Sequence, residues 1–144
     1  MGFDVANRKA IIYDSGTERF TGTTMVGIAN AVIGVLKNAD RTANKHLLVR
    51  SVETCQNELL TAFEEASGEK WPVTHETTKD LLARGREKYS IGDRGWILDL
   101  IVAQLLEEGE GRSIVATHES ADNALLEMPE ETLLGMVKGI LASS

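Results

Sequence analysis

The chain has 144 residues, of which 15 are Lys or Arg and 22 are Asp or Glu, so its formal charge is −7. This length fits a single domain spanning 1–144, and a hydrophobic content of 42% is enough to bury a core. The acidic balance argues against a nucleic-acid or anionic-membrane surface, and no apolar run approaches the roughly 18 to 20 residues of a membrane span. The N-terminal residues lack the pattern of a secretory signal, and the single cysteine, Cys55, cannot form an internal disulfide. We therefore expect a cytoplasmic protein.

The first part of the chain carries a strand signal and a helix signal. The apolar run Ala10–Tyr13 is closed by a turn cluster and predicts a strand. A helix is predicted from Thr24 onward, with Thr23 or Thr24 as N-cap and with a buried apolar stripe made of Met25, Ile28, Ala29, Val32, Ile33 and Leu36. Gly27 and Gly34 lie inside this helix, where each costs about 1 kcal/mol relative to alanine. We expect close backbone approach to a neighbouring sheet or helix there.

The middle of the chain alternates strand and helix signals. The short run His46–Val49 predicts a strand. Ser51 or Thr54 can cap the next helix, Gly68 suits its C-terminal end, and its predicted buried face is Leu59, Leu60, Phe63 and Ala66. A strand with one buried face is then predicted from the alternation of Trp71, Val73 and His75 with polar residues, and Pro72 favours an edge position.

Three helices are predicted in the last part of the chain. The first begins near Thr77 and is expected on the surface, weakened by Gly85. The second, Trp96–Leu106, is apolar almost all round and is predicted to be the most buried helix, so Ile101→Ala should cost on the order of 2 to 5 kcal/mol. The third is predicted to start at Pro129, with an inner face of Leu133, Met136, Val137, Ile140 and Leu141.

The order of these elements predicts the fold class. Helices that alternate with short strands imply parallel pairing through crossover connections. We therefore expect an α/β fold, with a short, mostly parallel sheet flanked and capped by helices.

Long ordered phrases of the chain resemble a known family. They are 2–16 (GFDVANRKAIIYDSG), 20–24 (FTGTT), 42–57 (TANKHLLVRSVETCQN), 65–71 (EASGEKW) and 122–131 (DNALLEMPEE). These phrases resemble the C-terminal half of fungal NmrA-like proteins, the isoflavone-reductase-like branch of the atypical short-chain dehydrogenases. The resemblance covers nearly the whole chain. It implies a partial Rossmann-related fold that corresponds to the substrate-side half of such an oxidoreductase.

The resemblance also implies that NAD(P) lies on an N-terminal doubly wound domain, whose glycine-rich turn supplies backbone N–H groups to the pyrophosphate. In this chain no predicted strand is followed by G-x-G-x-x-G or G-x-x-G-x-x-G. The family's catalytic lysine, or its tyrosine and lysine pair, is expected upstream and matches no position here. We therefore expect a chain truncated to its substrate-side half, with no cofactor of its own where full-length relatives use NADPH.

Two groups of residues are candidates for a site. His118, Glu119 and Asp122 place an imidazole near carboxylates in a loop, which is the composition of an acid/base site, although a solvated loop explains it as well. Tyr13, Phe20 and Trp96 are the candidates for an apolar substrate pocket, with core packing as the favoured alternative.

Cysteine and metal chemistry are weaker candidates. Cys55 lies near a helix N-terminus, where a thiol can become nucleophilic, but a buried and inert cysteine is the better interpretation. His46, His75 and His118 have no metal-ligand spacing, so no metal site is predicted.

Three function classes follow. The first is the substrate-side half of an NmrA-like protein, which binds an apolar small-molecule metabolite and neither binds NAD(P) nor transfers hydride alone. The second is a cofactor-independent isomerase or cyclase that uses the same pocket, with His118 and the nearby carboxylates as acid and base. The third is a binding or regulatory module that pairs with another chain or with itself, because a sheet without its neighbours exposes edges that a homo-oligomer or a partner chain would cover.

Overall fold

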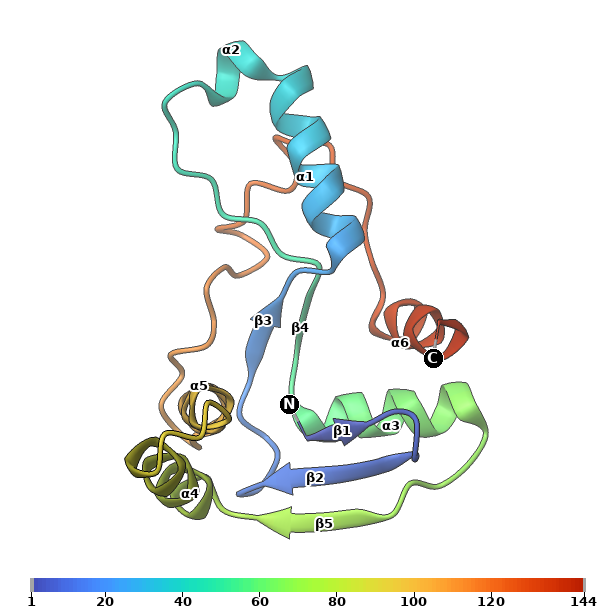
Figure 1. Cartoon of the computed structure of the whole chain (residues 1–144). Helices are drawn as coiled ribbons and strands as arrows, with labels where there is room; N and C mark the ends of the chain where they lie inside the picture. Colours follow the sequence, from blue (N-terminus) through green and yellow to red (C-terminus); the bar gives the residue numbers. More distant parts are fainter. Residues whose placement is uncertain (1, 144) are drawn as a thin grey trace.

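A computed structural model describes residues 2–143 and confirms the α/β class (Figure 1). Within that range, short strands and six helices follow one another along the chain. Their bounds are β1 Phe3–Asp4, β2 Lys9–Tyr13, β3 Phe20–Gly22, α1 Met25–Lys37, α2 Ala39–Thr42, β4 Val52–Thr54, α3 Gln56–Ser67, β5 Val73–Glu76, α4 Thr78–Ser90, α5 Trp96–Leu106 and α6 Leu133–Ala142. None of these helices is long and apolar enough to cross a membrane.

The strands form two small sheets rather than the one mostly parallel sheet that was predicted, and only the pair β2–β5 is parallel. In the order β1-β2-β5, β2 pairs in parallel with β5, Ala10 opposite Val73, and antiparallel with β1. The second sheet is the antiparallel pair β3 and β4. Pro72 precedes the edge strand β5, as predicted, and its carbonyl accepts a 3.0 Å hydrogen bond from the Ala10 amide. Of the predicted inward face of this strand, Trp71 is buried, whereas Val73 and His75 are exposed.

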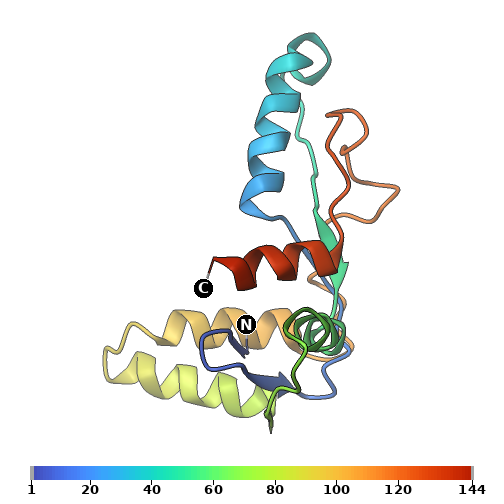
Figure 2. The ribbon, with the colours of Figure 1, turned by 90° about the vertical axis from the view of Figure 1, so that its right-hand side faces the viewer.

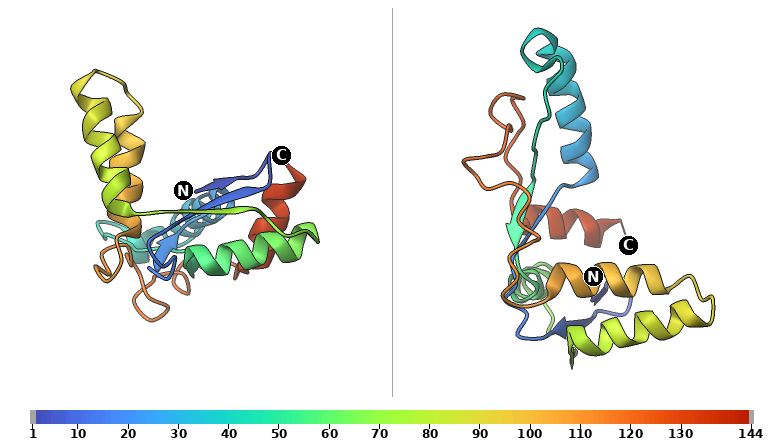
Figure 3. Two further views of the ribbon diagram at one scale, coloured as in Figure 1. Left: turned by 90° about the horizontal axis from the view of Figure 1, so that it is seen from below. Right: turned by 90° about the vertical axis from the view of Figure 1, so that its left-hand side faces the viewer.

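Two apolar clusters hold the elements together. One lies between the strand ends and the base of the α4–α5 hairpin and contains Tyr13, Phe20, Leu81, Ala103 and Leu106. The other lies where α6 packs on α3 and contains Ala62, Phe63, Trp71 and Val137. The hairpin and the α1–α2 arm extend in different directions from the sheets, so the molecule is open rather than spherical (Figures 2 and 3).

The helix predicted from Thr24 forms as α1, but its buried face is not the predicted one. Thr24 is the N-cap and accepts a hydrogen bond from the Gly27 amide. The buried residues of α1 are Gly27, Ala31 and Gly34, whereas most of the predicted apolar stripe is exposed. Close approach at the two glycines is confirmed, because a Cβ would clash with Ser51 Oγ at Gly27 and with the Leu126 carbonyl at Gly34. The neighbours are loop segments and not the predicted sheet or helix. The glycines, not the large apolar residues, therefore set which face of α1 packs.

The helix Trp96–Leu106 forms with the predicted bounds, but it is not the most buried helix. Only Ala103 and Leu106 are buried, and Ile101 is 47% exposed. The burial of Ile101, on which the predicted large cost of Ile101→Ala depends, is therefore wrong. The partner of α5 is α4, where Gly85 is buried and lets Leu100 approach its backbone. α4 is thus half of a packed hairpin rather than a surface helix weakened by glycine.

The strand predicted at His46–Val49 does not form. This segment is extended but pairs with no strand, and the strand of this region is β4, which begins at Val52. His46 is exposed, and Leu48 exchanges two backbone-directed hydrogen bonds with Asp122 instead. The apolar pattern of a segment does not reveal whether its backbone hydrogen bonds are made by a neighbouring strand or by a loop.

Two helix starts also differ from the prediction. α6 begins four residues after Pro129, at Leu133, because the hydroxyl of Thr132 accepts a hydrogen bond from the Gly135 amide and caps it. α3 begins after Cys55, and neither Ser51 nor Thr54 is its N-cap. The predicted inner faces of both helices are otherwise supported, except that Ile140 of α6 is exposed. Gly68 ends α3 in the left-handed conformation at φ 70°.

Candidate functional site

The candidate site is a cavity of about 590 Å³ between the segment that leads into β4 and the loop that joins α5 to α6. We call it the loop cavity. Apolar side chains come from Ala121, Ala124, Met128 and Pro129. The polar lining comes from Arg50, Ser51, His118, Asn123, Glu130 and Glu131.

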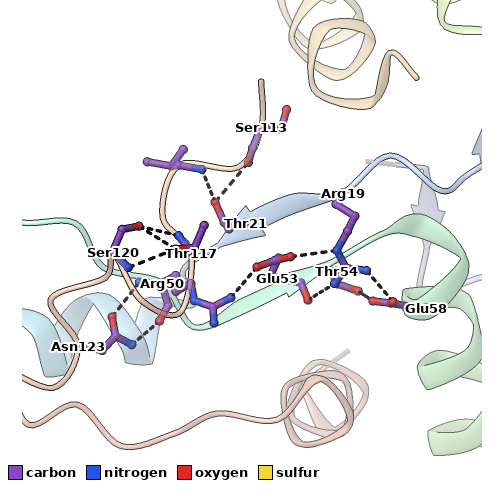
Figure 4. A network of polar contacts seen from close by, with 11 residues as sticks. Arg19, Thr21, Arg50, Glu53, Thr54, Glu58, Ser113, Thr117, Ser120 and Asn123 are labelled. Atoms are coloured by element: carbon purple, nitrogen blue, oxygen red, sulfur yellow. Dashed lines mark hydrogen bonds and ion pairs between the residues drawn. The ribbon is translucent and has the colours of Figure 1, made fainter. Parts of the chain in front are cut away.

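Along one wall of the loop cavity, side chains of the last loop form hydrogen bonds with the backbone of residues 48–50, as a neighbouring strand would. Asn123 clamps the backbone of Arg50, because its Oδ1 accepts from the Arg50 amide at 3.2 Å and its Nδ2 donates to the Arg50 carbonyl at 2.7 Å (Figure 4). Asp122 holds Leu48, two residues earlier, because its Oδ2 accepts from the Leu48 amide at 2.8 Å and its own backbone amide donates to the Leu48 carbonyl at 2.7 Å. The Asp-Asn pair therefore holds the 48–50 segment in place against the loop.

Arg50 and Arg19 are tied into one network of carboxylates along β4 (Figure 4). Arg50 Nη1 donates to Glu53 at 3.1 Å, and Arg19 donates to Glu53 at 3.0 Å and to Glu58 at 2.9 Å. The hydrogen bond from Arg19 lowers the pKa of Glu58 below its usual value, and Thr54, which donates to the same carboxylate at 3.0 Å, adds to this effect. The network fixes the Arg50 side chain, which is 17% exposed, at the cavity edge.

Glu131 closes the other side of the loop cavity at the N-terminus of α1. Its carboxylate accepts from the Thr24 hydroxyl at 2.8 and 2.9 Å and from the Ser51 hydroxyl at 2.5 Å. A negative charge is stabilised at this position by the helix dipole. Glu131 therefore joins α1, the start of β4 and the last loop at one point.

Of the three predicted acid/base residues, the structure brings only His118 to the loop cavity. His118 lies on a turn that Thr117 and Ser120 close through reciprocal hydrogen bonds of 2.9 and 3.2 Å (Figure 4). Glu119 is on the same turn and is exposed, but it does not line the cavity. The Asp122 carboxylate is engaged by the Leu48 amide. Acid/base chemistry at these residues stays a prediction, with His118 the member best placed for it.

The three predicted substrate-binding aromatics do not meet. Tyr13 and Phe20 are in the first apolar cluster, 5% and 7% exposed, where burial raises the pKa of the Tyr13 hydroxyl. Trp96 is at the other end of α5 from Leu106 and makes an edge contact with Tyr89, with ring centroids 5.1 Å apart. The three aromatics therefore do not line one pocket together, and none of them lines the loop cavity.

Cysteine and metal chemistry gain no support from the described residues. Cys55 is buried at the N-cap of α3, as predicted. No group of three potential metal-ligating side chains occurs in the described part of the chain.

The strand-to-helix junctions bear on whether a dinucleotide would fit. Each helix that follows a strand already has a carboxylate at its N-terminal end: Glu131 at α1, Glu58 in the first turn of α3, and Asp14 at α4. Asp14 accepts from the Thr78 amide at 3.0 Å and from its hydroxyl at 2.6 Å. A pyrophosphate needs free N–H donors at such an end and is repelled by a carboxylate. These carboxylates therefore disfavour a pyrophosphate at the three junctions.

The site contains residues that the sequence did not single out. Arg50, Ser51 and Asn123 lie in phrases quoted for the resemblance, but nothing in their spacing indicates a site. Glu131 could have been suspected only from its place in an acidic pair with Glu130, after Pro129. These residues meet across as many as 80 positions, and sequence periodicity does not register contacts at such separation.

Two fungal proteins are similar to the chain over nearly its whole length. It is 46% identical over 142 residues to oxidoreductase poxI of Penicillium oxalicum, covering 98% of this chain and 45% of that protein. It is 25% identical over 143 residues to oxidoreductase aprR of Aspergillus flavus, covering 96% of this chain and 48% of that protein. The chain thus spans about half the length of the curated relatives it matches. No family model matches it.

One solved structure has a similar fold. A nucleoside-diphosphate-sugar epimerase from Staphylococcus aureus matches with a TM-score of 0.57 and 22% identity, over 93% of this chain and 44% of that chain. The chain is therefore homologous to fungal oxidoreductases over about half of their length, and its fold corresponds to part of the epimerase fold.

Proposed function

We propose that the chain is the substrate-side half of an NmrA-like, isoflavone-reductase-like oxidoreductase. The observation that carries the proposal is the 46% identity to oxidoreductase poxI, which extends over 98% of this chain but 45% of that protein. In this proposal the chain holds the substrate, and hydride transfer requires an NAD(P)-binding region that residues 2–143 do not form.

We propose that the chain alone does not bind NAD(P), and the strand-to-helix junctions support this part of the proposal. The carboxylates of Glu131 and Asp14 accept hydrogen bonds from hydroxyl and amide groups at the starts of α1 and α4, respectively. Moving either carboxylate aside for a pyrophosphate would break these hydrogen bonds and place two anions together. The chain alone is therefore expected to bind neither NADPH nor NADH.

The loop cavity is the proposed substrate site. Met128, Pro129 and the two alanines suit an apolar body, and the Asn123 amide and the His118 imidazole suit one or two oxygen atoms at its rim. The proposed ligand is an apolar small molecule with a carbonyl or hydroxyl group. In this pose His118 would donate a hydrogen bond to the ligand oxygen.

The cofactor part of the proposal is tested by calorimetric titration of the chain with NADPH. We expect no binding by the wild type and none by Glu131→Gln, which removes the negative charge at α1 while keeping the hydrogen-bond acceptor. A dissociation constant in the low micromolar range for the wild type would contradict the proposal. Binding by the variant alone would mean that α1 does offer a phosphate site.

The substrate part is tested with acetophenone, an apolar probe with one carbonyl oxygen, in a titration followed by amide NMR. We expect the largest shifts at residues 121–124. Ala121→Trp should fill the loop cavity and abolish them, whereas Ala83→Trp, at an exposed position of α4, should not. Shifts confined to other parts of the chain would show that the loop cavity is not the binding site.

A further inference from the structure

One face of α1 exposes more large apolar side chains than any other helix in residues 2–143. The exposed fractions are 80% for Met25, 73% for Leu36, 64% for Val26, 55% for Val32, 49% for Ile33 and 45% for Ile28. We call these six residues the α1 face. The helix extends away from the β1-β2-β5 sheet, and the segment between α5 and α6 lies along its other side (Figures 1 and 2).

The α1 face cannot turn inward within this chain. The opposite side of the helix is held by Gly27, which sits against Ser51 and Glu131, and by Gly34, which sits against the backbone of Leu126. A side chain larger than hydrogen does not fit at either glycine. The apolar residues are therefore directed outward by close packing on the far side, and another molecule is needed to cover them.

The size of the α1 face is that of half an interface. Its exposed fractions correspond to on the order of 700 Å², close to the roughly 800 Å² that each partner contributes to a standard protein–protein interface. The largest apolar patch on a typical monomer is about 300 to 600 Å². The exposed residues of α5 (Ile97, Leu98 and Ile101) amount to about half as much as the α1 face and remain within that monomer range.

We propose that a second copy of this chain covers the α1 face, with the two α1 helices packed antiparallel about a two-fold axis. The apolar positions are symmetric about the middle of the helix, so Met25 of one copy would meet Leu36 of the partner subunit, and Ile28 would meet Ile33 of the partner subunit. Ala29, between them, is small enough to let the helices approach.

Charge favours the same contact. Each copy has a formal charge of −7, so most of its surface repels a second copy. The segment 25–36 contains no charged residue. It is therefore a surface on which two copies can meet without placing carboxylates together.

A groove of about 790 Å³ beside the α1 face adds to the contact. Its apolar lining is Met25 and Val26 with Met136 and Ile140 of α6, and at one side it is also lined by Glu130 and Glu131, which it shares with the loop cavity. In the antiparallel arrangement, the far end of the second helix lies over this groove, so Leu36 of the partner subunit would enter it. The contact then extends beyond the two helices, and it does not depend on the proposed substrate site.

The test is sedimentation equilibrium of the intact chain over a range of micromolar concentrations, with two matched variants. Ile33→Glu changes the α1 face, and Ile101→Glu changes an isoleucine of nearly equal exposure in the middle of α5, 49% against 47%. Both side chains are exposed in a single copy, so both variants should fold, as circular dichroism checks. We expect a dimer for the wild type and for Ile101→Glu, and at least a tenfold weaker dimer for Ile33→Glu.

Three results would overturn the proposal. A wild-type chain that remains a monomer of 15.7 kDa at high micromolar concentration would mean that something other than a second copy covers the α1 face. A dimer that Ile101→Glu disrupts while Ile33→Glu does not would assign the contact to α5. A dimer unaffected by both variants would assign it to neither helix.

Discussion

The packing of α5 predicts very different consequences for two truncations within the same helix. Leu106 is 2% exposed and packs with Tyr13, Phe20 and Leu81, so Leu106→Ala should leave a cavity and cost about 2 to 5 kcal/mol. Ile101 is 47% exposed, and Ile101→Ala should cost about 1 kcal/mol or less, because roughly half of its surface already faces solvent.

Urea denaturation of the two variants measures this difference. With an m value of about 1.5 kcal/mol/M, Leu106→Ala should lower the unfolding midpoint by more than about 1 M, and Ile101→Ala by about 0.7 M or less. Equal m values would show that the denatured states are comparable. Equal midpoints, or a larger effect at Ile101, would refute the assignment of the α5 core to its C-terminal end.

Two further predictions concern α1 and the carboxylate network. Gly34→Ala should destabilise the chain by about 1 to 3 kcal/mol, because its Cβ would clash with the Leu126 carbonyl. Gly139→Ala, with open space around it, should be neutral or stabilising. Equal melting temperatures for the two variants would argue against the close approach at Gly34. The pKa of Glu58 is lowered by Arg19, so the contribution of this carboxylate to stability is complete above its unfolded pKa of about 4.5 and is lost as the pH falls through the folded value. The urea midpoint of Glu58→Gln should therefore fall less on acidification than that of the wild type. Parallel curves of midpoint against pH would contradict this.

The sequence was sufficient to predict where most helices lie, because apolar periodicity and caps are local. Trp96–Leu106 and the start of α1 after Thr24 are examples. Periodicity did not reveal which side of α1 is buried, since that choice depends on how closely Gly34 approaches Leu126, far away in the chain. The same limit explains α5, whose apolar residues are shared between α4, the first cluster and solvent.

The candidate site was less predictable than the helices. His118 was identified from its composition with nearby carboxylates, and it does line the loop cavity. Arg50 and Glu131 were not, because their roles come from contacts with Asn123 and Thr24, which lie 73 and 107 positions away in the chain. Asp122 was predicted as an acid/base residue, but its observed hydrogen bond is to the backbone of the 48–50 segment, which no spacing rule would indicate.

The proposal that the chain holds a substrate and not a dinucleotide can be tested by an amide NMR spectrum recorded with a large excess of NADPH. The starts of α1, α3 and α4 each have a carboxylate in place, so we expect no shifts at residues 24–27, 55–58 or 77–80. Saturable shifts at any of these junctions would place a phosphate at a helix end, and the chain would then bind a dinucleotide on its own.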